Sequence, residues 1–544
     1  MRATFSLLLL AVHTAVVSSA VLDTIIDEVK REYQEVTNRI ATSPGIPVAQ
    51  PMTPYWTIPV SPISQHGKDD PLPQDSDVVV IGSGVTGLAV VHTLLESSAK
   101  KQLRIVMLEA RDATSGATAR NGGHITPNLY NDYSDLKEAY GIDVAKQIIN
   151  FRFSHIDAFL NVCKAVDVGA DSQCRKVDTF DLYLDQEEFN TGKANLEAYL
   201  QDFPEQRPIW RIVDNLDSIQ VSPETVAGAI TTTAGALHPY RYVTSVLSYL
   251  LSKHSQTFQL FTNTPALEIT SDASGYSIKT SRGTIRTQNV VHATNGWASH
   301  LLPKLRGKVI PIRGHMTAHR PGTNMGAFPV NSPNPQANNS WAGTRSFTIS
   351  GASTYNYLTQ QLPASASIPG GKFPASNGEF MFGGGLDASS ITTVLPELGV
   401  ADDHKPVDLT LGGYLSGALS MYFGKHWGPE GRPDKPESDE LNPGRVLKVW
   451  TGILGLSADF RPWIGRIPAA LTDRAEPKKS DVTAPGEWIA AGYSGEGMAH
   501  AFLAGKAVAD MILGTPDVKV PEPFVITEAR WERASLENLV AGAL

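Results

Sequence analysis

The spacing of apolar residues predicts an α/β fold with a parallel sheet. An apolar strand pattern from Val78 leads into a glycine-rich turn, a helical pattern over Leu88–Ser97 and a second strand over Leu103–Leu108. Strand, helix and strand in this order are typical of a β-α-β unit. A second strand, turn and helix follow near the C-terminus, at Trp488–Ala491 and Ala499–Leu513.

The rest of the chain separates into an N-terminal extension and a long mixed middle section. Apolar residues at helical spacing predict one amphipathic helix over Val21–Ile40. The proline-rich segment Pro44–Pro73 is expected to be an extended arm on the main body. Residues from about 136 to 440 mix helical and strand patterns, and Pro321–Asn377 resembles insertions around strands, without an internal repeat.

The first 20 residues have the layout of a secretory signal peptide. Arg2 precedes an apolar run, Phe5–Val12, and small residues stand at positions −3 and −1 of a cut after Ala20. A membrane anchor is the alternative, but a span needs about 20 mostly apolar residues, and His13 and several hydroxyl residues interrupt this run. We expect a secreted protein with no membrane span.

Composition and charge exclude other classes of protein. The 544 residues are 42% hydrophobic and 19% charged, which is typical of a folded chain, and 46 basic against 55 acidic residues make nucleic acid an improbable partner. Two cysteines, Cys163 and Cys174, are too few for a disulfide framework or a cysteine-rich zinc site, and no metal is expected. In an oxidising compartment they would form one disulfide or remain two buried thiols. Asn338 lies in the only proline-free glycosylation sequon.

A dinucleotide-binding fingerprint follows the first strand. Gly82 permits a tight turn, Gly84 lets the backbone approach a pyrophosphate, and Gly87 lets the helix pack closely on the strand. The helix N-terminus then faces the phosphates. Glu109 ends the second strand 22 residues after Gly87, where an acid would bind a ribose hydroxyl. These features alone fit either NAD or FAD.

The residues after Glu109 resemble the second signature of the DAO family, the FAD-dependent amine and amino-acid oxidoreductases. The resemblance begins in the segment Arg111–His124 and continues in Val290–Trp297 and Ala490–Met498. Members of this family include glycine, sarcosine and gamma-glutamylputrescine oxidases. The resemblance covers nearly all of residues 75–515, and it implies an FAD-binding Rossmann-like, three-layer domain with a second α+β domain on a mixed or antiparallel sheet.

The resemblance also implies domain boundaries and a set of cofactor contacts. FAD-binding segments are expected at about 75–135, 230–300 and 440–515, a substrate domain at about 136–229 and 301–439, an extension at 21–74 and a tail at 516–544. The expected FAD contacts, which all lie in glycine-rich turns or beside them, are Gly82, Ser83, Gly84, Val85, Thr86, Gly87, Glu109, Ala110, Arg111, Gly116, Ala117, Thr118, Arg120, Asn121, Gly122, Gly123, His124, Ala266, Thr294, Asn295, Gly296, Gly492, Ser494, Gly495, Gly497 and Met498.

The cofactor is expected to be held without a covalent bond. Some relatives attach the flavin through a histidine of the early loop, and Arg120 stands at that position here. Others use a cysteine near the C-terminus, but no cysteine follows Cys174. His124 remains an alternative for a link or a flavin contact, although an ordinary structural histidine is the favoured interpretation. Backbone N–H groups after Gly497 are expected to face the negative charge of the reduced ring.

The implied chemistry is the oxidation of a C–N bond in a small molecule, with oxygen as final acceptor and hydrogen peroxide as product. Arg313 would bind a substrate carboxylate and His315 would orient or deprotonate an amine, or both are structural. Arg461 would lie close to the flavin, and an Asp459–Arg461 pair bracing a loop is the alternative. Tyr355, Tyr357, Tyr422 and Trp427 would line an amine pocket or belong to the core.

Three other functions remain open on the sequence. The same fold could oxidise a different bond of a natural product, bind flavin without turnover, or act as a nicotinamide dehydrogenase. The last would leave Arg120–Gly123 and Gly495–Met498 without a purpose. The substrate and the oligomeric state are not determined by the sequence.

Overall fold

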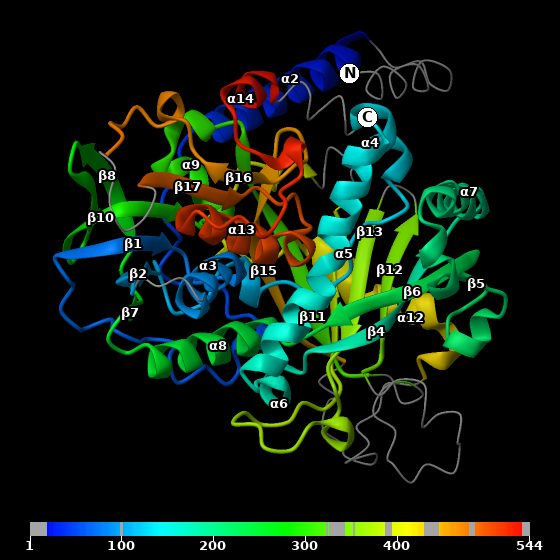
Figure 1. Ribbon diagram of the computed structural model, residues 1–544. Coiled ribbons are helices and arrows are strands. Elements are labelled where there is room, and N and C mark those ends of the chain that lie inside the picture. Colours follow the sequence, from blue (N-terminus) through cyan, green and yellow to red (C-terminus); the bar gives the residue numbers. More distant parts are fainter. Residues whose placement is uncertain are drawn as a thin grey trace, which may run out of the picture.

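The structure is a computed structural model that describes residues 19–97, 102–321, 325, 343–351, 354–386, 394–428, 445–477 and 485–535. Residues 1–18 of the expected leader, together with Asn338, lie outside this range. Within the range, every helix is too short or too polar to cross a membrane. Figure 1 shows two sheets side by side, with β1, β2 and β10 on the left and β4, β12 and β13 on the right.

The first sheet has eight strands, and its central part is parallel. Six of them follow the order β16-β17-β10-β1-β2-β7, and β8 and β9 extend it through β10. β1 pairs in parallel with both β2 and β10, so Val78, Val79 and Val80 are completely buried. This double burial explains the continuous apolar run at this point of the sequence. The strands of this sheet are β1 (Asp75–Ile81), β2 (Ile105–Leu108), β7 (Phe258–Phe261), β8 (Ala266–Asp272), β9 (Gly275–Thr280), β10 (Gly283–His292), β16 (Trp463–Arg466) and β17 (Gly486–Ala491).

Two helices, α3 (Val85–Glu96) and α13 (Ala501–Leu513), pack against each other beside this sheet. They correspond to the helices that the sequence predicts at Leu88–Ser97 and Ala499–Leu513, with ends that differ by up to three residues. A Cβ atom on Gly505 of α13 would lie 2.5 Å from the carbonyl oxygen of Thr86 in α3. The close approach of the two helices therefore depends on a glycine at this position, and it brings the two glycine-rich turns together.

The second sheet has nine strands and is mixed. Its order is β15-β11-β14-β13-β12-β4-β6-β3, with β5 paired to β6; β4 and β12 are parallel, and its other pairs are antiparallel. Its strands are β3 (His124–Ile125), β4 (Arg175–Tyr183), β5 (Arg211–Val213), β6 (Gly228–Ala236), β11 (Val309–His319), β12 (Arg345–Gly351), β13 (Thr354–Gln360), β14 (Phe380–Gly383) and β15 (Val446–Ser457). The two sheets give the expected fold class, an FAD-binding-type Rossmann-like layer structure with an α+β second domain.

Three strands of the second sheet come from segments expected to belong to the nucleotide domain. They are β3, β6 and β15. The chain thus crosses between the two sheets more often than the expected boundaries imply. β15 pairs with β11 along the whole length from Val309 to His319, and β-strand pairing at this distance in sequence leaves no local signal.

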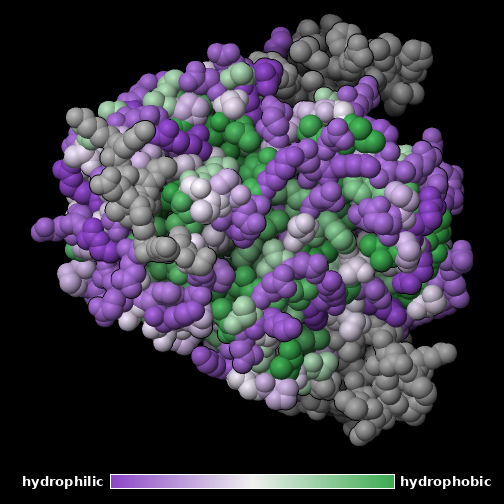
Figure 2. Space-filling model, in the orientation of Figure 1, coloured by the Kyte–Doolittle hydropathy of each residue, from purple (hydrophilic) through white to green (hydrophobic). Residues whose placement is uncertain are grey.

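A helix of the middle section packs on the second sheet. On α12 (Leu409–Phe423), Leu415, Leu419 and Tyr422 pack with Phe347 and Phe382 of the sheet in one apolar cluster. The interpretation of Tyr422 and Trp427 as core residues is therefore confirmed, since both belong to this cluster. The other α-helices in the described part of the middle section are α4 (Tyr133–Tyr140), α5 (Ile142–Ala165), α6 (Gly169–Ser172), α7 (Gln186–Asp202), α8 (Pro239–Lys253) and α9 (Ala298–Leu301). In Figure 2 apolar residues show mainly toward the middle of the face, where α5 and α13 lie in Figure 1.

The N-terminal extension lies along the main body as a helix and an arm. Helix α2 (Ser19–Ala41) includes the predicted helix and runs along the top of Figure 1. In the arm, the indole of Trp56 is almost completely buried and donates a hydrogen bond to the carbonyl of Asn121. Tyr55 donates to Glu379 at 2.9 Å. The arm therefore supports the loop in which the flavin contacts are expected.

The described part of the C-terminal tail packs onto the body. It ends in α14 (Glu528–Arg533), from which Arg530 forms an ion pair with Asp459 at 2.8 Å. The Arg530 guanidinium also lies 3.9 Å from the centre of the Trp463 ring. The side-chain partner of Asp459 is thus Arg530, whereas Arg461 gives Asp459 only a backbone N–H bond at 3.1 Å. The Asp459–Arg461 pair that the sequence suggested is therefore wrong, and Arg530 is the arginine that braces this loop.

The two cysteines are free thiols in the structure. Cys163 lies near the end of α5, and its sulfur is 3.4 Å from the Ser172 hydroxyl. A hydrogen bond with Cys174 lowers the pKa of Cys163 to about 7. This contact places the thiols next to each other, and a disulfide between them stays a prediction.

Candidate active site

A cavity of about 170 Å³ lies at the carboxyl ends of β1 and β2. Ligands of parallel α/β sheets bind at this edge, because the loops that follow neighbouring strands meet there. Of the expected FAD contacts, the cavity is lined by Gly82, Ser83, Gly84, Val85, Thr86, Glu109, Ala110, Arg111, Gly116, Ala117, Thr118, Asn121, Ala266, Thr294, Asn295, Gly495, Gly497 and Met498. Segments from four distant parts of the sequence therefore line one cavity.

The three glycines of the fingerprint have the geometry that the sequence predicts. Gly82 has a φ of 108°, which favours glycine. A Cβ on Gly87 would lie 1.9 Å from the carbonyl oxygen of Gly82, and one on Gly84 would lie 2.8 Å from the Thr118 hydroxyl. Gly87 itself does not line the cavity. Its role is to hold the helix against the turn, whereas Gly84 lines the cavity and leaves room for the Thr118 hydroxyl.

Glu109 faces this cavity with its carboxylate held by three donors. One oxygen accepts bonds from the Ser83 backbone N–H at 3.1 Å and from the Ser83 hydroxyl at 2.6 Å, and the other accepts from the Arg111 N–H at 3.1 Å. A fixed carboxylate beside a glycine-rich turn suits the hydroxyls of a ribose. The fixed carboxylate of Glu109 and the cavity beside it therefore fit the adenosine half of a dinucleotide.

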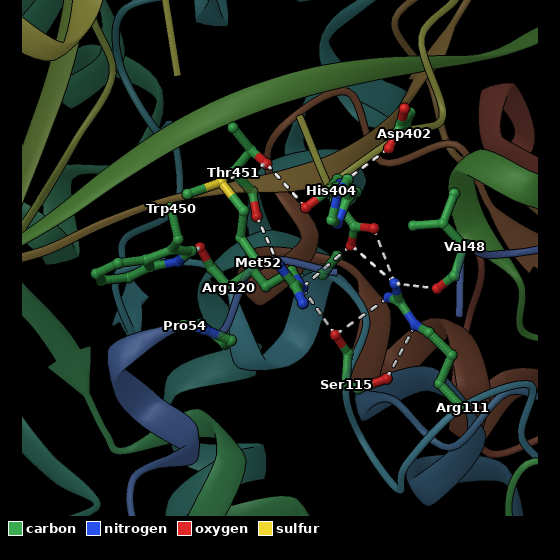
Figure 3. A network of polar contacts seen from close by, with 12 residues as sticks. Val48, Met52, Pro54, Arg111, Ser115, Arg120, Asp402, His404, Trp450 and Thr451 are labelled. Atoms are coloured by element: carbon green, nitrogen blue, oxygen red, sulfur yellow. Dashed lines mark hydrogen bonds and ion pairs between the residues drawn. The ribbon is translucent and has the colours of Figure 1, made fainter. Parts of the chain in front are cut away.

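The expected flavin contacts Arg111 and Arg120 share a buried carboxylate. Arg111 Nη1 lies 2.8 Å from Asp403, and Arg120 Nε lies 3.3 Å from the other oxygen of Asp403. Figure 3 shows the two arginine side chains approaching each other beside Ser115, whose carbonyl accepts a bond from each. Burial lowers the pKa of Arg120 to about 10, although Asp403 opposes this change. The arginines therefore fix the loop between them, and Asp403 compensates part of their positive charge.

The glycine-rich turn near the C-terminus closes the cavity from the opposite side. Gly492, Ser494 and Gly495 have φ values of 74°, 51° and 90°. The turn is tied to α3 by a bond of 2.7 Å between the hydroxyls of Tyr493 and Thr86. Helix α13 begins at Ala501, after a 3₁₀ turn over Gly497–Ala499. The N–H groups expected to face a flavin ring therefore belong to this short turn.

A second, larger cavity of about 560 Å³ continues from the first. The two cavities share five lining residues, which come from the early loop, β15 and the late turn: Ala117, Asn121, Leu454, Gly495 and Met498. Arg120, Gly122, His124 and Ser494 line the second cavity alone, and Gly123, Gly296 and Gly492 line neither. A long ligand in the first cavity would thus present one end to the second.

Of the predicted substrate residues, His315, Tyr355 and Tyr357 line the second cavity. His315 Nε2 lies 3.6 Å from Glu397. Arg313 does not line either cavity, and its guanidinium is paired with Glu397 through Nη2 at 2.9 Å. Burial opposes ionisation of Glu397, but His315 and Arg313 together lower its pKa to about 2. Carboxylate binding by Arg313 stays a prediction that this buried pair does not favour.

Arg461 lies outside the lining of both cavities. Its guanidinium is 5.8 Å from the centre of the Tyr140 ring. A direct role in catalysis therefore stays a prediction without support from the position of the side chain.

His124 is buried in the wall of the second cavity, and neither ring nitrogen has a hydrogen-bond partner. Burial lowers its pKa to about 3, so its ring is neutral at physiological pH. The ring lies 6.5 Å from that of Tyr357, nearly parallel to it. An uncharged histidine with free nitrogens in a cavity is available to a ligand.

The sequence did not point to two acids of the second cavity, Asp181 and Glu496. Asp181 stands in β4 at a position whose neighbours on the same face are Thr179 and Tyr183. An acid between Thr179 and Tyr183 on one face of the strand was the available signal. Glu496 lies inside the late glycine turn, between Gly495 and Gly497, which are the stronger signal in the sequence.

The comparisons with known proteins agree with this geometry. Residues 77–511 match the family model described as FAD dependent oxidoreductase. The chain belongs to this family. FAD is therefore its cofactor, and the fixed carboxylate of Glu109 and the glycine turns are the groups that would hold it.

Two curated bacterial proteins are similar to part of this FAD-dependent oxidoreductase. A protein described as a probable oxidoreductase, OrdL of Haemophilus influenzae, is 22% identical over 46% of this chain and 56% of its own. Gamma-glutamylputrescine oxidoreductase of Escherichia coli is 22% identical over 43% of this chain and 53% of its own. The chain thus spans about half the length of these curated relatives.

Solved structures share the fold at low sequence identity. L-proline dehydrogenase from P. horikoshii has a TM-score of 0.57 and 18% identity, covering 86% of this chain and 100% of that one. Glycine oxidase from Geobacillus kaustophilus has a TM-score of 0.56 and 18% identity, covering 84% and 99%. These similarities support the fold of the family member described here.

Proposed function

We propose that this FAD-dependent oxidoreductase is a secreted oxidase that removes hydride from carbon next to nitrogen in an amine or amino-acid-like substrate. The observation that carries the proposal is the junction of the two cavities. Ala117, Asn121, Gly495 and Met498, which are all expected flavin contacts, line both of them. A ring held at this junction would meet a substrate in the larger cavity. The names of the bacterial relatives and structural neighbours, which include amine and amino-acid enzymes, support this substrate class.

FAD, when bound, supplies the two-electron acceptor for the hydride. The substrate loses a hydride from carbon and a proton from nitrogen, water then hydrolyses the imine to a carbonyl compound and an amine, and O₂ takes two electrons and two protons to give H₂O₂. The nitrogen must be uncharged at the moment of oxidation, because an ammonium group has no lone pair. The protein therefore needs groups that accept a hydrogen bond or a proton beside the ring.

Two histidines of the larger cavity meet this need. His124 is neutral and has free ring nitrogens, so it can accept a hydrogen bond from a substrate N–H. His315 lies beside Glu397, whose carboxylate would stabilise the charge of a protonated imidazole. We assign to these residues the orientation of the amine and the acceptance of its proton.

The catalytic proposal is tested with the purified holoenzyme under anaerobic conditions. Amines, amino acids and alcohols are added in turn, and the loss of visible flavin absorbance is recorded, followed by peroxide release after admission of air. We expect bleaching by a C–N donor and stoichiometric peroxide. Bleaching by alcohols alone would assign a different bond, and no bleaching by any donor would indicate a flavin-binding protein without turnover.

Non-covalent binding and secretion have their own measurements. Acid precipitation of the holoenzyme should leave free FAD in the supernatant, because the guanidinium of Arg120 stands where some relatives have a linking histidine. A yellow pellet would contradict this.

Secretion is tested by N-terminal sequencing of the protein from culture medium. The sequence should begin near Val21, whereas an intact Met1 would argue against a cleaved leader.

A further inference from the structure

The larger cavity has a wall made by one row of residues across the second sheet. Met316 of β11 pairs with Gly383 of β14, which pairs with Tyr357 of β13; Tyr357 pairs with Thr348 of β12, and Thr348 pairs with Asp181 of β4. Four steps between adjacent strands correspond to about 19 Å along the sheet. Of these five residues all except Gly383 line the cavity. The cavity is therefore elongated, and Asp181 lies far along the wall from β11.

Asp181 has two neutral hydrogen-bond donors and no cation beside it. Tyr130 donates to one carboxylate oxygen at 3.0 Å, and the Thr348 hydroxyl donates to the other. Within the described chain, no lysine, arginine or histidine contributes to its ionisation. Burial raises its pKa, and the two hydroxyls only partly oppose this change. A carboxylate in such a place lacks the counter-charge that buried acids normally have.

Buried polar groups without partners surround the same end of the cavity. The hydroxyls of Thr179 and Thr232 have no hydrogen-bond partner, and both side chains are more than nine-tenths buried. They lie on neighbouring strands directly opposite each other, and both line the cavity. Unsatisfied buried groups of this kind are rare in folded proteins unless a ligand or water completes them.

The cationic groups that could hold a substrate carboxylate are already engaged. Among the described lining residues, Arg120 is the sole arginine or lysine, and Asp403 and two carbonyls occupy its guanidinium. Residues 387–393, which follow the lining residue Leu386, contain no lysine or arginine. Glu496 adds a second acid near the junction of the cavities, where Arg152 lies 3.6 Å from it. Asp181 is therefore the one lining charge without an ion-pair partner among the described residues.

Aromatic rings line the same cavity as the two acids. Tyr355 lines the cavity, and desolvation together with the charges of Asp181 and Glu496 raises the pKa of its hydroxyl. Tyr130 and Trp210 line the Asp181 end with their rings 5.1 Å apart. Ring faces and carboxylates together suit a substrate with positive charge.

From these contacts we infer that Asp181 is a subsite for a second, distal cationic group, so that the preferred substrates are elongated amines carrying an ammonium group at the end opposite the oxidised C–N bond. This inference rests on the proposed amine oxidation and names its substrate class. The reacting amine lies near the junction of the cavities, and the distal cation supplies the counter-charge that Asp181 lacks. A free carboxylate at the distal end is disfavoured, because it would meet Asp181 without a counter-ion.

The test compares three substrates of equal length: 1,8-diaminooctane, n-octylamine and 8-aminooctanoate. For the wild-type holoenzyme we expect kcat/KM for the diamine to exceed that for n-octylamine by at least tenfold, mainly through KM, and 8-aminooctanoate to be the poorest. In Asp181→Asn the diamine should lose at least tenfold, while n-octylamine changes less than about twofold. Equal wild-type kcat/KM for diamine and monoamine, or an Asp181→Asn enzyme that keeps the preference, would overturn the inference.

Asp178→Asn is the matched control. Asp178 lies on the same strand, exposed on the opposite face, so the same change of charge there should leave the preference intact. If Asp181→Asn fails to fold, Thr348→Val removes one donor to Asp181 and should weaken the diamine preference by severalfold. An unchanged preference in that variant would count against the subsite.

A binding measurement separates this inference from the proposed function. Octane-1,8-bis(trimethylammonium) and octyltrimethylammonium have no oxidisable amine, and their binding is measured from the shift of the visible flavin spectrum. The doubly charged probe should bind at least tenfold more tightly to wild type, and Asp181→Asn should abolish the difference. If the doubly charged probe binds more tightly but no amine is oxidised, the oxidase is refuted and the subsite is retained. If the two probes bind equally but amines are oxidised, the subsite is refuted and the oxidase is retained.

Discussion

A single carboxylate, Asp403, compensates two buried arginines. Its side chain is completely buried, and it contacts Arg111 at 2.8 Å and Arg120 at 3.3 Å. Asp403→Asn leaves both cations buried with no anion, and we expect it to lower the free energy of unfolding by about 3–5 kcal/mol. Because the arginines hold the loop from Ser115 to Arg120, FAD should be retained more weakly as well. Urea unfolding and the flavin-to-protein absorbance ratio measure the two effects.

Asp402→Asn provides the control for this substitution. Asp402 is adjacent in sequence and accepts one backbone bond, from His404 at 2.9 Å. Its substitution should change the unfolding free energy by less than about 1 kcal/mol. A loss in Asp403→Asn no larger than in this control would mean that the arginine cluster does not contribute to stability as the contacts indicate.

At the scale of elements, the contact of α3 with α13 holds the two glycine turns together. In Gly505→Ala the new methyl would lie 2.5 Å from the Thr86 carbonyl oxygen and 2.9 Å from the Ala89 Cβ, so the helices must move apart. We expect a loss of about 1–3 kcal/mol in stability and weaker FAD retention. Thermal unfolding with and without added FAD measures both.

Gly417→Ala is the matched change in another helix. Gly417 is exposed in α12, and a Cβ there meets nothing within 4 Å. Alanine should stabilise this helix by about 0.5–1 kcal/mol, since glycine loses more backbone entropy on folding. Stabilisation by both substitutions would show that α3 and α13 are not closely packed at Gly505.

For the whole molecule, several buried histidines predict sensitivity to mild acid. Burial lowers the pKa of His124 to about 3 and those of His155 and His319 to about 4, from a usual 6.5. The unfolded chain therefore binds these protons at higher pH than the folded chain. Stability should fall as pH drops from about 6.5 toward 4, by about 1.4 kcal/mol per pH unit for each histidine.

Urea midpoints measured at intervals from pH 7 to pH 4 test this expectation. His319→Gln, which does not titrate, should show a shallower decline than wild type. A stability that is constant over this interval, or an identical slope in the variant, would contradict the linkage.

The sequence by itself determined the parts of the site that depend on local geometry. Gly82 needs a positive φ, Gly87 meets the turn of its own helix, and Glu109 follows at the end of the next strand. These requirements act over about 30 residues, so they leave a fixed spacing in the chain. A dinucleotide-binding unit could therefore be inferred before the structure, whereas FAD, the family and its two-domain fold were implied by the resemblance of the segments that follow.

Only the tertiary structure decided which charges remain free for a substrate. Arg313 reads as a carboxylate ligand in the sequence, but Glu397 at a separation of 84 residues pairs with it. Arg111 and Asp403 are 292 residues apart, and Asp181 receives its donors from Tyr130 and Thr348. Whether a buried charge is neutralised depends on which distant strand or loop lies within a few ångströms of it. That distance is set by the pairing of the strands in two sheets, and it leaves no periodic or local pattern along the chain.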